Sequence, residues 1–390
     1  MKRIIDNVVS FPNGCETYHF AACYASALMR AENMINEKDY YVYCDRQKGD
    51  CISCGACGSS KPQKKHENVY NLYATVCGAT LFQMDLSSKE HMSKSWDTTV
   101  NNMSEEFDDY IKFTMDFAGY NYEALERIKG KEIDFSDIET SKEYAEWVKN
   151  DKAKIFTKIK TSVGKNKPVL FQLNEMVGHW MIIIGYDDDN MTLYGYDGSF
   201  GYWGKNPINS CEYEDKYFFT NNWYEYLNKI VIFGDRKEPS LDMKAVYSRA
   251  SKIMQEMQEK KYFQNSHAFM MDDSNFVGKS LDELITIKKN ISQWIGLPID
   301  MRSVLCWHIN VKQSDPWYYY LKAIDSYCCG THDILWIAWR AIGEYMDGEE
   351  KYWARGLENK IVRRAIADVI EIVAKNDVLI LERLKDIVNS

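Results

Sequence analysis

The chain has 390 residues, of which 45% are hydrophobic and 27% are charged, and its formal net charge is −9. This length suits two or three globular domains with a sizeable core. The acidic balance argues against nucleic-acid binding, because neutralising phosphates requires a concentrated basic surface.

The start of the chain lacks the apolar run of a secretory signal peptide, and no later segment approaches the roughly 18 apolar residues of a membrane-spanning helix. We therefore expect a cytoplasmic protein that does not contact a membrane. Eleven cysteines, an odd number, favour reduced thiols, metal ligands or catalysis over a disulfide framework in such a chain.

The first predicted helix covers residues 15–36, where small and apolar side chains recur at a helical spacing. Asn13 and Gly14 supply a turn before it, so Cys15 is expected to open the helix. A cysteine at this position is either a nucleophile or a small packed residue. Considered alone, the packed residue is the commoner case.

Residues 98–160 are predicted to be mainly helical, with a buried stripe made by Tyr144, Trp147, Ile155 and Ile159.

The pattern then changes to short β-rich runs bounded by Pro, Gly, Asn and Asp, which predicts an antiparallel sheet over residues 167–233. Residues 187–190 are predicted to form a hairpin turn between two of its strands.

A charged, proline-containing stretch at residues 234–242 is the predicted domain boundary, with Ser240 as a helix cap. The remainder is almost entirely helical in pattern and includes a capping box from Ser280 to Glu283. The predicted domains are residues 1–235, with a Cys-rich insertion at 44–66, and residues 236–390.

Two residues near the ends of predicted strands can support a thiol nucleophile. A hairpin about the predicted turn brings His179 nearly opposite Asp197, and their even offset lets both side chains face one side of the sheet. A carboxylate can then hold an imidazole, and an imidazole beside a helix N-terminus can activate the Cys15 thiol. Each residue also has a structural alternative: a packed cysteine, a histidine satisfied by backbone groups, and a turn aspartate.

The order Cys15, His179, Asp197 resembles that of the papain-like cysteine proteases, specifically the bacteriocin leader peptidases. The segment "GHWMIIIGYDDDNMTLYGYDG" is similar to their His-to-Asp segment, and "GCETYHFAACYASALM" is similar to the N-terminal domain of the butirosin biosynthesis acyltransferase family. The order and the helical extension also resemble the amide-forming type of enzyme from closthioamide biosynthesis. The resemblance covers about residues 1–235. It implies an α+β, papain-like (leader-peptidase-like) fold, with N-terminal helices packed on an antiparallel sheet, before a C-terminal all-helical domain.

By this resemblance, Cys15 accepts an acyl or peptidyl group from a carrier-protein thioester, His179 acts as base and Asp197 orients it. An amine, such as a diamine, then releases the product as an amide in natural-product biosynthesis of the non-ribosomal peptide type. The runner-up is a cysteine peptidase or hydrolase of the same fold, and the third hypothesis is a non-catalytic, zinc-stabilised scaffold.

The oxyanion hole departs from the leader-peptidase pattern. Those enzymes place a glutamine six residues before the nucleophile, and this chain has Val9 there. Asn13 is the candidate replacement, with Asn7 or the backbone N–H of Cys15 as alternatives.

Four closely spaced cysteines predict a structural zinc site, because four thiolates suit tetrahedral zinc. The alternative is a reduced loop without metal, and the pattern lacks the Cys-Pro ending of an iron–sulfur run. The acyl-transfer chemistry itself needs no cofactor. The cysteines are Cys44, Cys51, Cys54 and Cys57.

Two further features have alternative interpretations. His19, one helical turn after Cys15, ranks below His179 as the base, because a strand carboxylate cannot easily hold it. A lysine cluster usually marks a solvated face, although it could dock an acidic carrier protein. The cluster comprises Lys152, Lys154, Lys158, Lys160, Lys165 and Lys167, with Lys61, Lys64 and Lys65 in the insertion.

Overall fold

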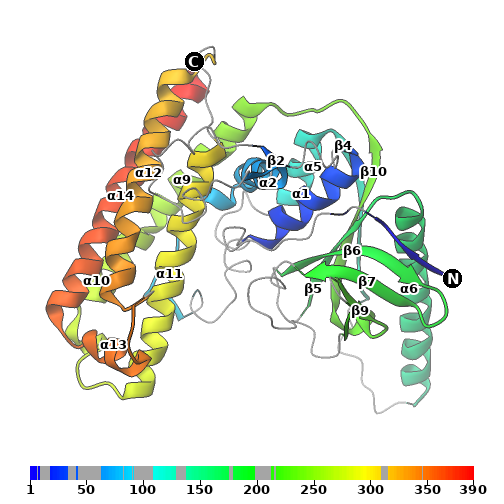
Figure 1. The fold of residues 1–390 in the computed structure, drawn as a ribbon, viewed down its shortest axis with the longest axis horizontal. Coiled ribbons are helices and arrows are strands. Elements are labelled where there is room, and N and C mark those ends of the chain that lie inside the picture. The colour runs from blue at the N-terminus through cyan, green and yellow to red at the C-terminus, as the bar shows by residue number, and fades with distance from the viewer. Residues whose placement is uncertain are drawn as a thin grey trace. The chain divides into compact units, whose positions relative to one another are not determined.

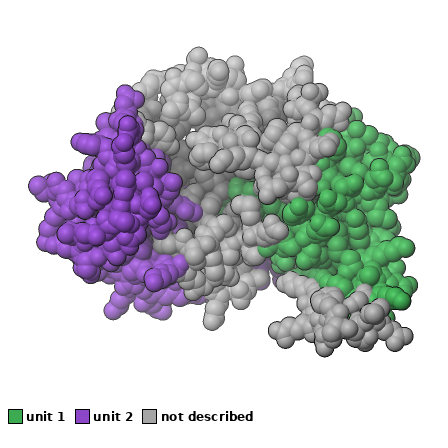
Figure 2. Space-filling model, turned by 90° about the horizontal axis from the view of Figure 1, so that it is seen from below, with its two compact units in different colours: residues 1–42, 64–70, 118–240 green, residues 43–63, 71–117, 241–390 purple. Residues whose placement is uncertain are grey.

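The structure is a computed structural model, and contacts divide the chain into two compact units, which Figure 2 colours separately. Unit 1 comprises Met1–Val42, Lys64–Tyr70 and Ala118–Ser240, and unit 2 comprises Tyr43–Gln63, Asn71–Phe117 and Leu241–Ser390. The residues that the structure describes are 1–6, 8, 18–33, 41–42, 63–81, 83–89, 91, 109–128, 138–174, 179–197, 212–214, 217–308, 315–344 and 346–390.

Unit 1 is built on an eight-stranded sheet whose described strand pairs are all antiparallel (Figure 1). The strand β1 (Lys2–Ile4) pairs with the last part of β6. The other strands follow the spatial order β4 (Tyr120–Glu126), β10 (Leu227–Arg236), β5 (Val169–Leu173), β6 (Trp180–Asp187), β7 (Thr192–Asp197), β9 (Tyr217–Thr220) and β8 (Glu212–Glu214). A separate ladder joins β2 (Tyr41–Val42) to β3 (Gln63–Lys64).

The predicted strands between residues 167 and 233 are confirmed, and residues 188–191 form the predicted turn. The strand β4 was not predicted, because it lies within the stretch 98–160 that was assigned as mainly helical. Pairing with β10 decides its conformation, since six of its residues have a partner there. β-Propensity depends strongly on such pairing, so local sequence is a weak guide at this position.

A glycine allows β1 to approach β6 closely. Gly185 pairs with Ile4, next to a register shift in β6 between Ile183 and Gly185. A Cβ atom on Gly185 would lie 2.7 Å from the carbonyl oxygen of Arg3. A larger residue would therefore force the two strands apart.

Two helices pack on the sheet of unit 1. The first is α1 (His19–Ala31), in which Phe20 contacts Trp180 with ring centroids 5.3 Å apart. The second is α6 (Ile138–Gly164), in which Phe156 contacts Tyr186 with centroids 6.1 Å apart. A one-turn helix, α8 (Trp223–Tyr226), leads into β10. The predicted N-terminal helix is thus present, but it begins at His19, because Tyr18 has extended backbone angles and is its N-cap, and it ends at Ala31. The prediction that Cys15 opens this helix is therefore wrong.

Only half of the predicted stripe on α6 is buried. Ile155 and Ile159 are at most 1% exposed, whereas Trp147 is 57% exposed and Tyr144 is half-buried. The prediction that Tyr144 and Trp147 join the core is therefore wrong. Residues 142–150 are exposed or half-buried throughout, so this part of the helix contributes nothing to the core of the described residues.

Unit 2 is helical in its described part (Figure 1). Helix α2 (Lys65–Val76) contributes its last six residues to this unit. The other elements are η2 (Ala79–Leu81), α5 (Tyr110–Ala118), α9 (Met243–Lys260), α10 (Tyr262–Met271), η4 (Asp273–Asn275), α11 (Leu281–His308), α12 (Tyr318–Ala341), α13 (Glu350–Gly356) and α14 (Lys360–Asn389).

Residues 71–117 group with the C-terminal helices, whereas the sequence pattern assigned them to the first domain. Buried polar contacts explain this grouping. Arg302 of α11 donates to the carbonyl oxygens of Thr80 and Leu81, and Gln83 Nε2 donates to Asp377 Oδ2 at 2.8 Å. Unit 2 is therefore discontinuous in sequence, and its last segment begins at Leu241, within the predicted boundary stretch.

Two helix caps of unit 2 can be compared with their predicted positions. Asp242 caps α9 by accepting from Ala245 N at 2.9 Å, so the prediction of Ser240 as the cap is wrong by two residues. The predicted capping box is confirmed: Ser280 N donates to Glu283 Oε2 at 2.9 Å, and Glu283 N donates to Ser280 Oγ at 3.3 Å.

No helix in the described part of the chain combines the length and apolar content that a bilayer crossing requires.

Candidate active site

His179 lies at the entrance of β6 in unit 1. It directly precedes Trp180, the first residue of the strand, and only 3% of it is exposed. Its carbonyl oxygen accepts from Leu173 N at 3.0 Å, which ties its backbone to the end of β5. The backbone of His179 is therefore held where β5 ends and β6 begins.

The His179 imidazole contacts His19, the first residue of α1. The two ring centroids lie 4.1 Å apart, with an angle of 60° between the ring planes. Such an edge-to-face arrangement is a favourable geometry for aromatic rings and restrains their orientation. The prediction ranked His19 below His179 as a base but did not foresee that the two side chains would touch.

Neighbouring contacts fix the start of α1. Phe20 packs on Trp180, and both side chains are fully buried. Tyr18, the residue before α1, donates its backbone N–H to the hydroxyl oxygen of Tyr70 in α2 at 3.2 Å. Unsatisfied N–H groups are normal at a helix start, so this tyrosine supplies one of the missing acceptors. Tyr70 was not among the predicted site residues.

Asp197 is the last residue of β7, and its pairing partner in β6 is Met181. The prediction placed it nearly opposite His179, which instead lies two residues before Met181. The expected alternation of side chains holds only within a strand, and β6 begins after His179. The hairpin itself is as predicted, and it brings the two backbone segments to neighbouring strand ends.

Several predicted site residues lie outside the described residues, so their roles stay predictions. They are the nucleophile Cys15, the oxyanion candidates Asn13 and Asn7, and the zinc candidates Cys44, Cys51, Cys54 and Cys57. Within the described ranges, no group of three or more His, Cys, Asp or Glu side chains could hold a metal ion.

Two other cysteines are packed in the interior. Cys23 of α1 and Cys328 of α12 are both fully buried. Burial raises the pKa of the Cys328 thiol well above its usual range. A thiol held in its protonated form is a poor nucleophile, so Cys328 is a structural residue.

Four of the six cluster lysines between residues 152 and 167 have partners within unit 1. Lys158 pairs with Glu123 at 2.9 Å, and Lys160 pairs with Asp188. Lys152 donates to Asn221 O at 3.2 Å, and Lys167 donates to Gly234 O. Lys154 and Lys165 are exposed. Among the six lysines between residues 152 and 167, these two are thus the exposed ones.

Residues 60–231 match the model of the Peptidase_C39 like family. The match supports a papain-like cysteine-protease-type fold, in agreement with the α+β architecture and the antiparallel sheet. The matched region includes His179 and Asp197 and begins after Cys15. It covers less than half of the chain. No curated protein and no solved structure matches the chain.

Proposed function

We propose that this protein is an acyl or peptidyl transferase that forms an amide through a thioester on Cys15. In this proposal, His179 is the general base and Asp197 orients it. The supporting observation is the contact of the buried His179 imidazole with His19, in the first turn of α1. Cys15 precedes His19 by four residues, and four residues of chain span at most about 14 Å. This limit is compatible with an approach of the proposed nucleophile to the proposed base.

The first proposed step loads the enzyme. His179 takes the proton of the Cys15 thiol, and the thiolate attacks the carbonyl carbon of a carrier-protein thioester. The carbon–sulfur bond to the carrier breaks, and the leaving sulfur receives the proton from His179. The acyl group is then bound to Cys15 as a new thioester.

The second proposed step forms the product. An amine attacks the Cys15 thioester, His179 takes a proton from the attacking nitrogen, and the Cys15 sulfur leaves and is reprotonated. One amide bond forms, one thioester bond breaks, and no oxidant, reductant or cofactor is consumed. The oxyanion of each tetrahedral intermediate needs hydrogen-bond donors, for which we propose the Asn13 side chain.

A cysteine hydrolase or peptidase is the second candidate function. The observation that favours it is the family match itself, since the matching family is described as peptidase-like. Hydrolysis follows the same first step, after which water replaces the amine. The two candidates therefore differ only in which acceptor reaches the thioester. A catalytically inactive scaffold, with zinc bound by Cys44, Cys51, Cys54 and Cys57, is the third candidate, and metal analysis of the purified protein tests its zinc.

Intact-protein mass spectrometry tests the proposal. We expect incubation with an acyl-N-acetylcysteamine thioester to add one acyl group to the wild-type chain. The adduct should be absent in Cys15→Ala and strongly reduced in His179→Ala. Cys23→Ala is the matched control, because Cys23 is buried in α1 and should leave acylation unchanged. An unchanged adduct in Cys15→Ala would exclude both enzymatic candidates at this site.

The acceptor is tested on the same loaded enzyme. Adding 1,3-diaminopropane should convert the thioester to the mono-amide faster than water releases free acid. Release of free acid at a rate that the diamine does not alter would assign the hydrolase instead.

A further inference from the structure

Unit 2 contains a cavity of about 540 Å³ whose lining residues include none of the proposed triad. Three segments form its walls: the turn at residues 86–89, the end of α10 with η4, and α11. Small-molecule sites typically have volumes of roughly 300–1,000 Å³, so the cavity is of a suitable size for a ligand.

The first wall is anchored by a buried carboxylate. Asp85 is 6% exposed and accepts from Ser87 Oγ at 2.6 Å and from Asn265 Nδ2 of α10 at 2.7 Å. Leu86 N donates to Ser266 Oγ at 3.0 Å. These bonds join the turn to α10, which makes the wall rigid before any ligand binds.

The opposite wall is held in a similar way. Asp272 ends α10 and accepts from Ser274 N at 2.9 Å, and Asn275 Nδ2 donates to the carbonyl oxygen of Phe269 at 3.0 Å. The N–H of Ser274 lowers the pKa of the Asp272 carboxyl group, which therefore stays ionised at neutral pH.

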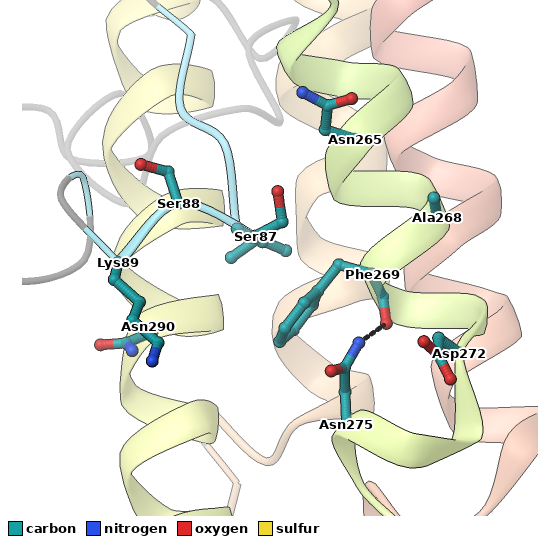
Figure 3. A pocket seen from close by; sticks show the side chains of 10 residues that line it. Ser87, Ser88, Lys89, Asn265, Ala268, Phe269, Asp272, Asn275 and Asn290 are labelled. Carbon is teal, nitrogen blue, oxygen red and sulfur yellow. Dashed lines mark hydrogen bonds between the residues drawn. The ribbon is translucent and has the colours of Figure 1, made fainter.

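The cavity presents opposite charges on two sides. Figure 3 shows Lys89 and Asn290 together on one side, Asp272 on the other, and Phe269 with Asn275 between them. Lys89 and Asn290 can donate to an anion, whereas Asp272 and the Asn275 carboxamide oxygen can accept from a cation. The Phe269 ring offers an apolar surface between the two ends.

We propose that this cavity binds a short zwitterionic peptide, with its carboxylate at Lys89 and Asn290 and its ammonium group at Asp272. In Figure 3 the Phe269 ring lies between the two charged sides, so a ligand that contacts both must extend past this ring. The two charged groups of a single amino acid lie about 2.5 Å apart, whereas an extended dipeptide separates its ends by about 7 Å. The longer dipeptide is therefore the ligand that we expect to extend past the ring and to place a side chain on Phe269.

Isothermal titration calorimetry with the full-length chain tests the site. The probe is the dipeptide Gly-Leu, compared with its N-acetylated form and its C-terminal amide. For a ligand of this size in an open, polar site we expect a Kd of about 1 mM. Removing either terminal charge should weaken binding by about fivefold or more.

Two variants assign each end of the ligand to its residue. In Lys89→Gln the free dipeptide and its amide should bind equally, and in Asp272→Asn the free and N-acetylated dipeptides should bind equally. Asparagine can still accept from Ser274 N, so the cap of η4 survives the second substitution. The matched controls are Lys385→Gln and Asp282→Asn, which alter exposed residues of the same unit outside the cavity and should keep both preferences.

Two outcomes would overturn the proposal. One is no saturable binding of Gly-Leu by the wild-type chain at ten times the expected Kd. The other is binding whose dependence on the terminal charges is the same in Lys89→Gln and Asp272→Asn as in the wild type. Thermal melting of each variant identifies any loss of binding that comes from unfolding.

Discussion

The imidazole rings of His19 and His179 lie in edge-to-face contact, with centroids 4.1 Å apart. One ring comes from the first residue of α1 and the other from the residue that precedes β6. The contact therefore joins the start of the helix that follows Cys15 to the proposed general base. The two histidines are 160 residues apart in sequence.

His19 should act by positioning the His179 ring, so its shape matters more than its basicity. His19→Phe keeps a ring in contact, and we expect Cys15 to react with iodoacetamide at pH 7 within about twofold of the wild-type rate. His19→Ala frees the His179 ring, and we expect that rate to fall by about tenfold, since catalysis depends on such orientation. Mass mapping of the Cys15 peptide measures both rates. Equal losses in the two variants would show that packing by His19 does not orient the base.

Asp197 should support His179 through its negative charge. Asp197→Asn retains the size of the side chain, and we expect turnover of the thioester probe to fall by about 10³- to 10⁴-fold, as for other triads. Asp189→Asn in the exposed turn between β6 and β7 is the control and should leave turnover unchanged. Wild-type turnover in Asp197→Asn would remove Asp197 from the triad.

The ion pair of Arg302 and Asp377 should be essential to the stability of unit 2. Both side chains are 1% exposed, and Arg302 Nη2 lies 2.8 Å from Asp377 Oδ2. Arg302→Leu leaves a buried, uncompensated charge, so we expect the free energy of unfolding to fall by about 3–5 kcal/mol. Urea denaturation measures this change.

The double variant Arg302→Leu, Asp377→Leu should recover part of that loss, because it removes both charges. Recovery should be incomplete, since Gln83 and the carbonyl oxygens of Thr80 and Leu81 lose partners. Arg364→Leu, at an exposed pair with Asp368, is the control and should change stability little. A loss for Arg302→Leu no larger than that of the control would contradict this account.

Cys328 should be unreactive in the folded protein because burial raises the pKa of its thiol. A raised pKa means that the thiol stays protonated as pH increases through the ordinary cysteine value of about 8.5. We expect no modification of Cys328 by a disulfide reagent at this pH, and complete modification in guanidinium chloride. Its half-buried neighbour Cys329 is the internal comparison. Modification of both cysteines at one rate in the native protein would refute the prediction.

If an acidic carrier protein docks on α6, the exposed lysines should provide most of the electrostatic attraction to it. Charge reversal at Lys154 and Lys165 together should raise the Michaelis constant for a carrier-bound donor, and added salt should reduce the difference. Lys158→Gln is the comparison, because Lys158 is already paired with Glu123 and should affect docking less. No change in the double variant would leave the cluster as a solvated face.

The sequence predicted those features of the fold that depend on neighbouring residues. The strands β5, β6, β7, β9 and β10 were recognisable because β-rich runs end at turn-forming residues, and the Ser280–Glu283 box because its hydrogen bonds span one helical turn. Two wrong predictions, the helical assignment of β4 and the burial of Trp147, have a common cause: both depend on residues distant in sequence. β4 is a strand because β10 pairs with it, and Trp147 lies in a part of α6, residues 142–150, that is exposed or half-buried throughout.

For the candidate site, the sequence by itself determined which residue types are available: a thiol after a glycine, a histidine before a strand and an aspartate at the end of the next. Only the tertiary structure decided that His19 touches His179, that Met181 pairs with Asp197, and that Lys158 and Lys160 are bound to acidic partners. These relationships join residues far apart in the chain. Local periodicity carries no information about such contacts, because they are set by how helices and strands pack.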